Sequence, residues 1–323
     1  MISFERFLSS ARRTLEGRAR GHGYARLAES IDHDLYGTAA AVGILIGLGE
    51  RPEGELAATL RSGILDFRQA DGTFADPTHG VHHRAATALT TLRALGGSSP
   101  EPSAVAPLLR AESVRPFLDQ LDWSDPWLTS HDAAGVLAIG LSTEAVDARA
   151  RRLWLDAYLD WLAENVDPST GLWRRGAMGD LDDFPGLFGN LACSFHLHFL
   201  LTHLGRPWPY PTRVVDTGLA LYRDTAAVVG GERADWGFRQ LDWVYSVARS
   251  GDGGHRPVEV TECLVDLAER AAVAFEDPDA AAGDLHVLQA RVCLVAELSR
   301  HLPDRLDVGE RSLVTILDER PFI

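Results

Sequence analysis

The sequence predicts an all-α protein built as a single (α/α)6 toroid of six helix pairs. Two observations support this prediction. First, a polar, amphipathic segment followed by an apolar, Ala- and Leu-rich segment recurs about every fifty residues along the 323-residue chain. Second, no segment alternates with a period of two for long enough to predict a large sheet. A helix pair cannot bury its apolar face alone, so consecutive pairs are expected to cover one another in a closed ring.

The first segment of each pair is amphipathic and is expected to form an outer ring. In 144–166, for example, Trp154, Tyr158 and Trp161 follow the spacing of one helix face, and charged residues take the opposite face. The six expected outer helices lie within 2–16, 52–69, 104–121, 144–166, 211–226 and 257–276.

The second segment of each pair is apolar almost all round, which predicts an inner ring in the middle of the protein. Asp residues stand before these segments, where N-caps belong, and Gly residues stand where helices end. We expect the inner helices to run parallel. Their expected ranges are 35–49, 81–97, 125–141, 184–205, 237–251 and 284–302, starting near Tyr36, His79, Trp127, Asp183, Asp235 and Asp284.

The unbroken pattern predicts one domain over 1–323, with 305–323 as a C-terminal tail. Within this tail we expect one more helix at about 308–318, packed across the ring.

Composition excludes some classes of function. The net charge of −15 disfavours nucleic acid as a partner, because binding depends on basic groups that neutralise phosphates. No apolar run reaches the roughly 18 residues that a transmembrane helix needs, and the first residues lack the apolar core of a signal peptide. We therefore expect a cytoplasmic protein. Its cysteines, Cys193, Cys263 and Cys293, are expected to be reduced.

A turn motif occurs twice between an outer and an inner segment. In 65–97, Gln69, Gly72 and Phe74 precede an inner helix that carries Ala-Thr-Ala and closes in Leu-Gly. From 154 onward, Asn165 stands in the place of Gln, and Gly171 and Trp173 complete the turn. These stretches resemble the repeats of the terpene cyclase and protein prenyltransferase superfamily. The resemblance implies the αα-toroid fold and, as an activity, isoprenoid chemistry.

The sequence Asp180-Leu181-Asp182-Asp183 matches the DxDD acid motif of class II terpene cyclases. The resemblance implies that Asp182 protonates an alkene or epoxide, with Asp180 and Asp183 tuning its pKa. The alternative is an acidic loop ahead of a helix, with Asp183 as N-cap. Phe184 and Pro185 stand where the family usually has Thr-Ala, so both interpretations stay open.

Parallel inner helices would bring their first turns to one mouth, where their N-terminal dipoles favour an anionic group. We expect His131 to act there as a catalytic residue. The side chains expected to bind the substrate are His82, His83, Trp127, Phe188, Trp236, Gln240, Trp243 and His286. His79 and His83 could share a metal if their helix starts early, but the sequence predicts neither a metal nor a cofactor.

The first function hypothesis is an isoprenoid cyclase of bacterial secondary metabolism, class II in style, acting on a small molecule in an aromatic cavity. The second is a carbohydrate-active hydrolase, epimerase or lyase that uses the His and Asp residues of the mouth. The third is a non-catalytic toroid that binds a small molecule or a partner protein. Apolar walls would favour the first, a polar cleft with a stacked Trp the second, and a filled centre the third. The oligomeric state is not predicted.

Overall fold

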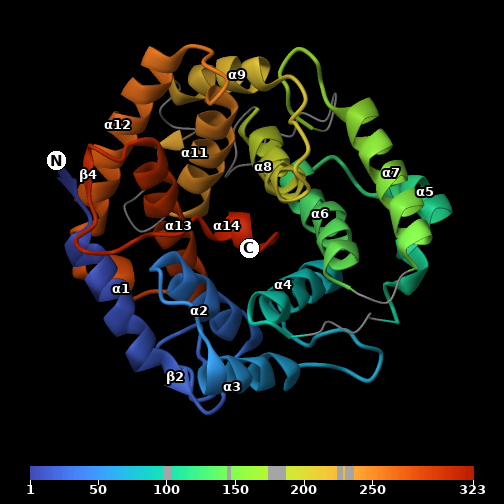
Figure 1. Cartoon of the computed structure of the whole chain (residues 1–323), viewed down its shortest axis with the longest axis horizontal. Coiled ribbons are helices and arrows are strands. Elements are labelled where there is room, and N and C mark those ends of the chain that lie inside the picture. The colour runs from blue at the N-terminus through green and yellow to red at the C-terminus, as the bar shows by residue number, and fades with distance from the viewer. Residues whose placement is uncertain (98–102, 144–146, 174–186, 224–227, 230–235) are drawn as a thin grey trace.

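The computed structural model describes residues 1–97, 103–143, 147–173, 187–223, 228–229 and 236–323. Within these ranges the protein is mostly helical, so the predicted all-α class is confirmed. Figure 1 shows the helices disposed around the C-terminal segment. Among the described residues, no helix combines the length and the apolar character needed to cross a membrane.

The inner helices are buried along most of their length, as their apolar composition predicts. Their bounds are α2 (Leu35–Gly47), α4 (Val81–Ala94), α6 (Pro126–Ser142), α8 (Phe188–His203), α11 (Phe238–Gly251) and α13 (Leu285–His301). Each contacts the next in chain order, and α13 contacts α2. Small residues allow close approach: a Cβ at Gly43 of α2 would lie 2.2 Å from Nε2 of Gln289 on α13.

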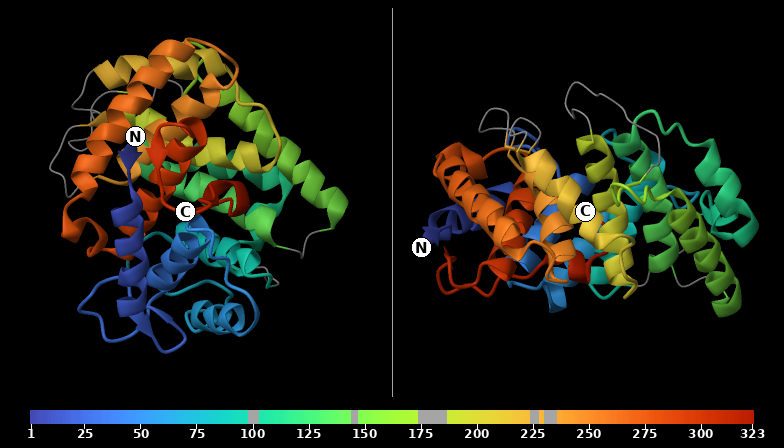
Figure 2. Two further views of the ribbon diagram at one scale, coloured as in Figure 1. Left: turned by 60° about the vertical axis from the view of Figure 1, so that its left-hand side comes forward. Right: turned by 90° about the horizontal axis from the view of Figure 1, so that it is seen from above.

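The amphipathic helices lie outside this inner layer (Figures 1 and 2). They are α1 (Glu5–Arg18), α3 (Gly54–Leu65), α5 (Ala111–Gln120), α7 (Ala148–Asn165), α9 (Pro211–Arg223) and α12 (Pro257–Phe275). In the described part of the chain, the 3-10 turns η1 (Ala106–Leu109) and η3 (Pro278–Ala281) accompany them. Most outer helices contact an inner neighbour, whereas α5 packs mainly on α7.

Three of the predicted N-caps are confirmed. The side chains of Asp34, Asp125 and Asp284 accept hydrogen bonds from the backbone N–H groups of their own first turns, at 2.6, 2.9 and 2.8 Å. Asp183 and Asp235 lie outside the described residues.

The two turn motifs have the same local structure. Gly72 and Gly171 have φ angles of +80° and +76°, a left-handed conformation that favours glycine. The aromatic residue two positions later, Phe74 in one turn and Trp173 in the other, is buried. The motif therefore places an aromatic anchor between an outer and an inner helix in both repeats.

Two short strand pairs add to the helices. β1 (Ile2–Ser3) pairs in parallel with β4 (Leu306–Asp307), and β2 (Ala19–Arg20) pairs antiparallel with β3 (Gly23–Tyr24). Each strand has two residues, so neither pair changes the fold class.

The predicted helix at 308–318 is wrong. In this part of the chain only α14 (Ile316–Glu319) is helical. The tail does pack across the inner helices: Arg320, Phe322 and Ile323 are buried, and Arg320 donates to the carbonyl of Ala39 on α2 at 3.0 Å. The C-terminal segment therefore fills the centre of the helical arrangement (Figure 1).

Candidate functional site

Five histidines meet among the inner helices, four of them toward the N-terminal ends and one midway along its helix. The imidazole cluster consists of His79, which precedes α4, His83 on α4, His131 on α6, His196 on α8 and His286 on α13. Ring centroids are 4.2 Å apart for His79 and His83, 4.8 Å for His83 and His131, 5.1 Å for His131 and His196, and 5.8 Å for His79 and His286.

The local sequence explains why these rings come so close. His79 and His83 are four residues apart across the start of α4, so their rings lie on one side and stack. On α6, Gly135 faces the backbone of His82, where an added Cβ would meet the carbonyl oxygen at 3.1 Å. The absence of a side chain at Gly135 therefore lets α4 and α6 approach and brings His83 to His131.

Hydrogen bonds orient part of the cluster. The hydroxyl of Tyr36 lies 2.5 Å from Nδ1 of His83, and the hydroxyl of Ser130 lies 2.8 Å from Nδ1 of His196. Nε2 of His79 is buried and has no hydrogen-bond partner among the described residues. A buried polar atom without a partner is costly, and such atoms are few in folded proteins.

The cluster has a closed side and an accessible side. The ring of Phe322, from the C-terminal segment, lies 4.9 Å from His83 and covers it from within. His79 and His286 are half-buried, whereas His83 and His131 are buried. The accessible side is therefore formed by the loop before α4 and the first turn of α13.

Aromatic side chains flank this accessible side. Trp127 lies 4.9 Å from His131, and Phe238 lies 4.7 Å from His286. Both aromatics are half-buried, and part of the Phe238 ring remains available to a ligand.

Burial sets the protonation of the cluster. It lowers the pKa values of His83 and His131 well below the usual value, and repulsion from neighbouring imidazoles lowers them further. The pKa of His196 falls to about 3 for the same two reasons. These rings are therefore neutral at pH 7, and each keeps a nitrogen lone pair. Burial raises the pKa of Tyr36, which stays protonated.

The structure brings together four of the predicted mouth residues: His83, His131, Trp127 and His286. All four belong to the imidazole cluster or touch it. The expectation that first turns of inner helices share one end is therefore met for α4, α6 and α13.

Other predicted mouth residues lie elsewhere, which corrects their predicted placement. His82 turns outward: its Nδ1 lies 2.9 Å from Asp132, and its ring packs on Phe117 of α5. Trp243 is fully buried toward α9, where its indole N–H donates to the carbonyl of Gly218 at 2.8 Å.

Trp236 and Gln240 also differ from the predicted placement, whereas the predicted role of Phe188 stays a prediction. Trp236 packs on Phe275 of α12, with ring centroids 6.5 Å apart. Gln240 is buried and its side-chain oxygen accepts from the backbone N–H before α11, so it caps that helix. Phe188 is fully buried at the first position of α8.

The predicted acid motif cannot be placed. Asp180, Asp182 and Asp183 lie within 174–186, outside the described residues. Their roles as acid and tuning partners stay a prediction.

Sequence reasoning missed His196 as a member of the site. His196 and His198 are two residues apart and cannot share a helix face. On a helix that is buried all round, however, one of them can still face the centre. His196 does so, whereas His198 stacks on Trp208 at 3.9 Å.

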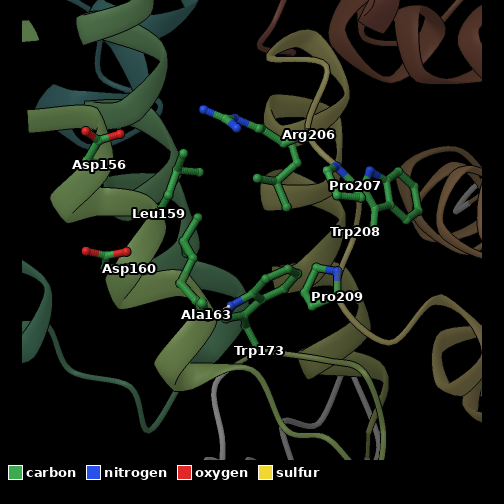
Figure 3. Close-up of a pocket in the computed structure, with 11 residues that line it drawn as sticks. Asp156, Leu159, Asp160, Ala163, Trp173, Arg206, Pro207, Trp208 and Pro209 are labelled. Atoms are coloured by element: carbon green, nitrogen blue, oxygen red, sulfur yellow. Dashed lines mark hydrogen bonds between the residues drawn. The ribbon is translucent and has the colours of Figure 1, made fainter. Parts of the chain in front are cut away.

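A separate pocket of about 710 Å³ lies between α7 and the segment 206–209. Figure 3 shows apolar Leu159, Ala163 and Trp173 along its wall, with Asp156, Asp160 and Arg206 nearer its edge. The chain that continues from Trp173 lies outside the described residues.

Comparisons with protein-family models, curated proteins and solved structures found no match to this chain. The resemblance to the terpene cyclase and prenyltransferase superfamily therefore remains a prediction.

Proposed function

We propose that this chain is an (α/α)6 toroid that catalyses proton transfer on a small polar molecule. The toroid is supported by the cyclic order of contacts among α2, α4, α6, α8, α11 and α13, each with an amphipathic helix before it in the chain. The C-terminal segment fills the centre, as a non-catalytic toroid would require, but it leaves His79 and His286 half-buried rather than enclosed. The convergence of five imidazoles around these two accessible rings supports the activity.

The character of the site favours a polar ligand. Its central groups are imidazoles, which form hydrogen bonds, and its flanks are the half-buried rings of Trp127 and Phe238. A polar centre with aromatic flanks suits a sugar or a similar ring, because the aromatic faces pack on C–H groups while the imidazoles contact hydroxyls. An isoprenoid would leave these imidazole nitrogens without partners.

Imidazole is also the side chain best suited to proton transfer near neutral pH. We assign the role of base to His286, because it stands at the accessible side beside Phe238 and is half-buried. Burial and the neighbouring His79 lower the pKa of His286 to about 3, so its ring is neutral at pH 7 and has a lone pair that can accept a proton. An epimerase, isomerase or lyase would use such a group to remove a proton next to a carbonyl or carboxylate of the substrate.

Hydrolysis by two facing carboxylates has less support. Near the mouth, Asp132 is engaged by His82, and Asp34 and Asp284 cap helices. The cyclase hypothesis still depends on Asp182, outside the described residues. A neutral imidazole would also take a proton from a carbocation, so the cluster fits that chemistry poorly.

Deuterium exchange would test the proposal. The protein would be incubated in D₂O with a panel of aldoses, amino sugars and uronic acids, and loss of C–H signals would be followed by proton NMR. We expect exchange at one carbon of at least one compound. His286→Gln should slow it by about 100-fold or more, in the range typical of a lost general base.

His203→Gln, at the other end of α8, is the matched control and should exchange like the wild type. Melting temperatures of both variants would show that the fold is kept. Absence of exchange across the panel, or exchange that is unchanged in His286→Gln, would overturn the proposal.

A further inference from the structure

We infer that His79, His83 and His131 form a binding site for one divalent transition-metal ion of the Zn²⁺ type. Each of these histidines offers one ligand nitrogen, and the three nitrogens all lie within 4.8 Å of one another. The inference stands apart from the proposed proton transfer, because it concerns three other histidines and is tested without a substrate.

The donor set points to the class of metal. Three imidazole nitrogens suit Zn²⁺, Co²⁺, Ni²⁺ or Cu²⁺, whereas Mg²⁺ and Ca²⁺ prefer oxygen ligands. Three protein ligands also leave a fourth position open for water or substrate, as in catalytic zinc sites. The half-buried His286 lies close to one of the three ligands, 5.8 Å from His79 between ring centroids.

The surroundings of the three rings are those of a metal site. The buried Nε2 of His79 has no hydrogen-bond partner among the described residues, and coordination of an ion would engage its lone pair instead. Tyr36 bonds Nδ1 of His83 at 2.5 Å, which leaves Nε2 of that ring for a ligand bond. Such a hydrogen bond behind a metal-binding histidine fixes the ring and its tautomer.

Binding requires a small contraction of the site. Ligand nitrogens about 2.1 Å from a tetrahedral ion are about 3.4 Å apart. The three nitrogens span up to 4.8 Å, so rotation of the side chains must bring them together. His79 lies in the loop before α4, where the backbone is not fixed by helical hydrogen bonds, and can make most of this movement.

The inference can be tested on the full chain, without a His tag, after treatment with a chelator. Zn²⁺ would be added in a calorimetric titration, and Co²⁺ would be followed by its visible absorption, which reports coordination by nitrogen. We expect one ion per chain with submicromolar affinity. His79→Gln and His131→Gln should each weaken binding by about 100-fold or more, and Tyr36→Phe by about 10-fold or more.

His203→Gln is again the matched control and should bind like the wild type. If His131→Gln fails to fold, His79→Gln still tests metal binding, because His79 lies in the loop before α4. Failure to bind Zn²⁺ and Co²⁺, or binding that is unchanged in His79→Gln, would overturn the inference. Because this readout needs no substrate, its failure would leave the deuterium-exchange result untouched, and the reverse also holds.

Discussion

At the scale of single residues, His196 and His198 show how two identical side chains on one helix acquire different roles. His196 faces the imidazole cluster, where it bonds Ser130. His198 faces the other way, where Nδ1 lies 3.2 Å from the hydroxyl of Ser246 and the ring stacks on Trp208. His198 is fully buried and lies outside the candidate site, so its effects on stability can be measured without disturbing that site.

Burial lowers the pKa of His198 to about 3. Its pKa in the unfolded chain is about 6.5, so below that pH the unfolded state binds more protons than the folded state. The folded protein therefore loses stability as the pH falls from 6.5 toward 3. Between pH 7.5 and pH 5, this one group should lower the free energy of unfolding by about 2 kcal/mol.

The measurement is urea unfolding of the wild type and of His198→Gln at both pH values. Gln cannot titrate but can still bond Ser246, so the loss of stability on acidification should be about 2 kcal/mol smaller in the variant. Its stability at pH 7.5 supplies the baseline, because the histidine is neutral there in both states. The same loss in both proteins would show that His198 does not titrate in this way.

At the scale of elements, the short helix α14 is stabilised mainly by ion pairs with other helices. It has four residues, yet Asp318 accepts hydrogen bonds from Arg249 of α11 at 2.5 Å and from Arg300 of α13 at 3.0 Å. Arg249 also pairs with the buried Glu297 at 2.6 Å. This network fastens the segment that carries Phe322 against the imidazole cluster.

We expect Asp318→Ala to loosen this segment. Hydrogen bonds to charged groups contribute about 1.5 to 3 kcal/mol each, less where they are partly exposed. Loss of the bonds to Asp318 should raise the rate of amide hydrogen exchange in 316–323 by about 10-fold or more, while exchange in α4 and α6 stays slow. Glu310→Ala, an exposed change in the same tail, is the control and should leave exchange unaltered.

The elements also show where periodicity stops being informative. Outer helices have one apolar face, so their burial could be predicted from the sequence. Inner helices are apolar all round, so the same reasoning cannot tell a residue that faces the centre from one that faces an outer helix. Trp243 of α11 was misplaced for this reason, because it packs against an outer helix. Trp236, just before α11, also packs against an outer helix. The tail was misjudged because it is ordered by contacts with distant helices.

At the scale of the whole molecule, the first and last helix pairs are joined directly. The buried Arg18 at the end of α1 donates to the backbone carbonyls of Arg26, Ala282 and Gly283. Next to it, Arg26 pairs with the N-cap Asp284 at 3.3 Å. These contacts accompany the packing of α13 on α2 and link segments from the two ends of the sequence.

The position of the candidate site was predictable only in part, and its chemistry was not predictable. Caps and repeats indicated that first turns of inner helices would meet, and His83, His131 and His286 do meet. Nothing local indicates that imidazoles would touch, because His131, His196 and His286 come from separate helices and their distances depend on packing. Gly135 is an example: it allows a close contact with α4, but the sequence does not show which helix lies opposite it.

If the helices form one closed unit, weakening the junction at Arg18 should destabilise all of them together. Arg18→Met keeps the apolar length of the side chain but removes the donors to three carbonyls, so we expect a loss of about 2 to 4 kcal/mol. Arg13→Met, at an exposed position of the same helix, should change stability by less than about 0.5 kcal/mol.

Urea unfolding would be followed by far-UV circular dichroism, which reports all helices, and by tryptophan fluorescence. All eight tryptophans lie within 123–243, far along the chain from Arg18. The two signals should therefore shift together to lower urea in Arg18→Met, because every inner helix depends on neighbours on both sides. Two separate transitions, with the fluorescence midpoint unmoved, would instead show that the first and last pairs unfold independently of the middle of the chain.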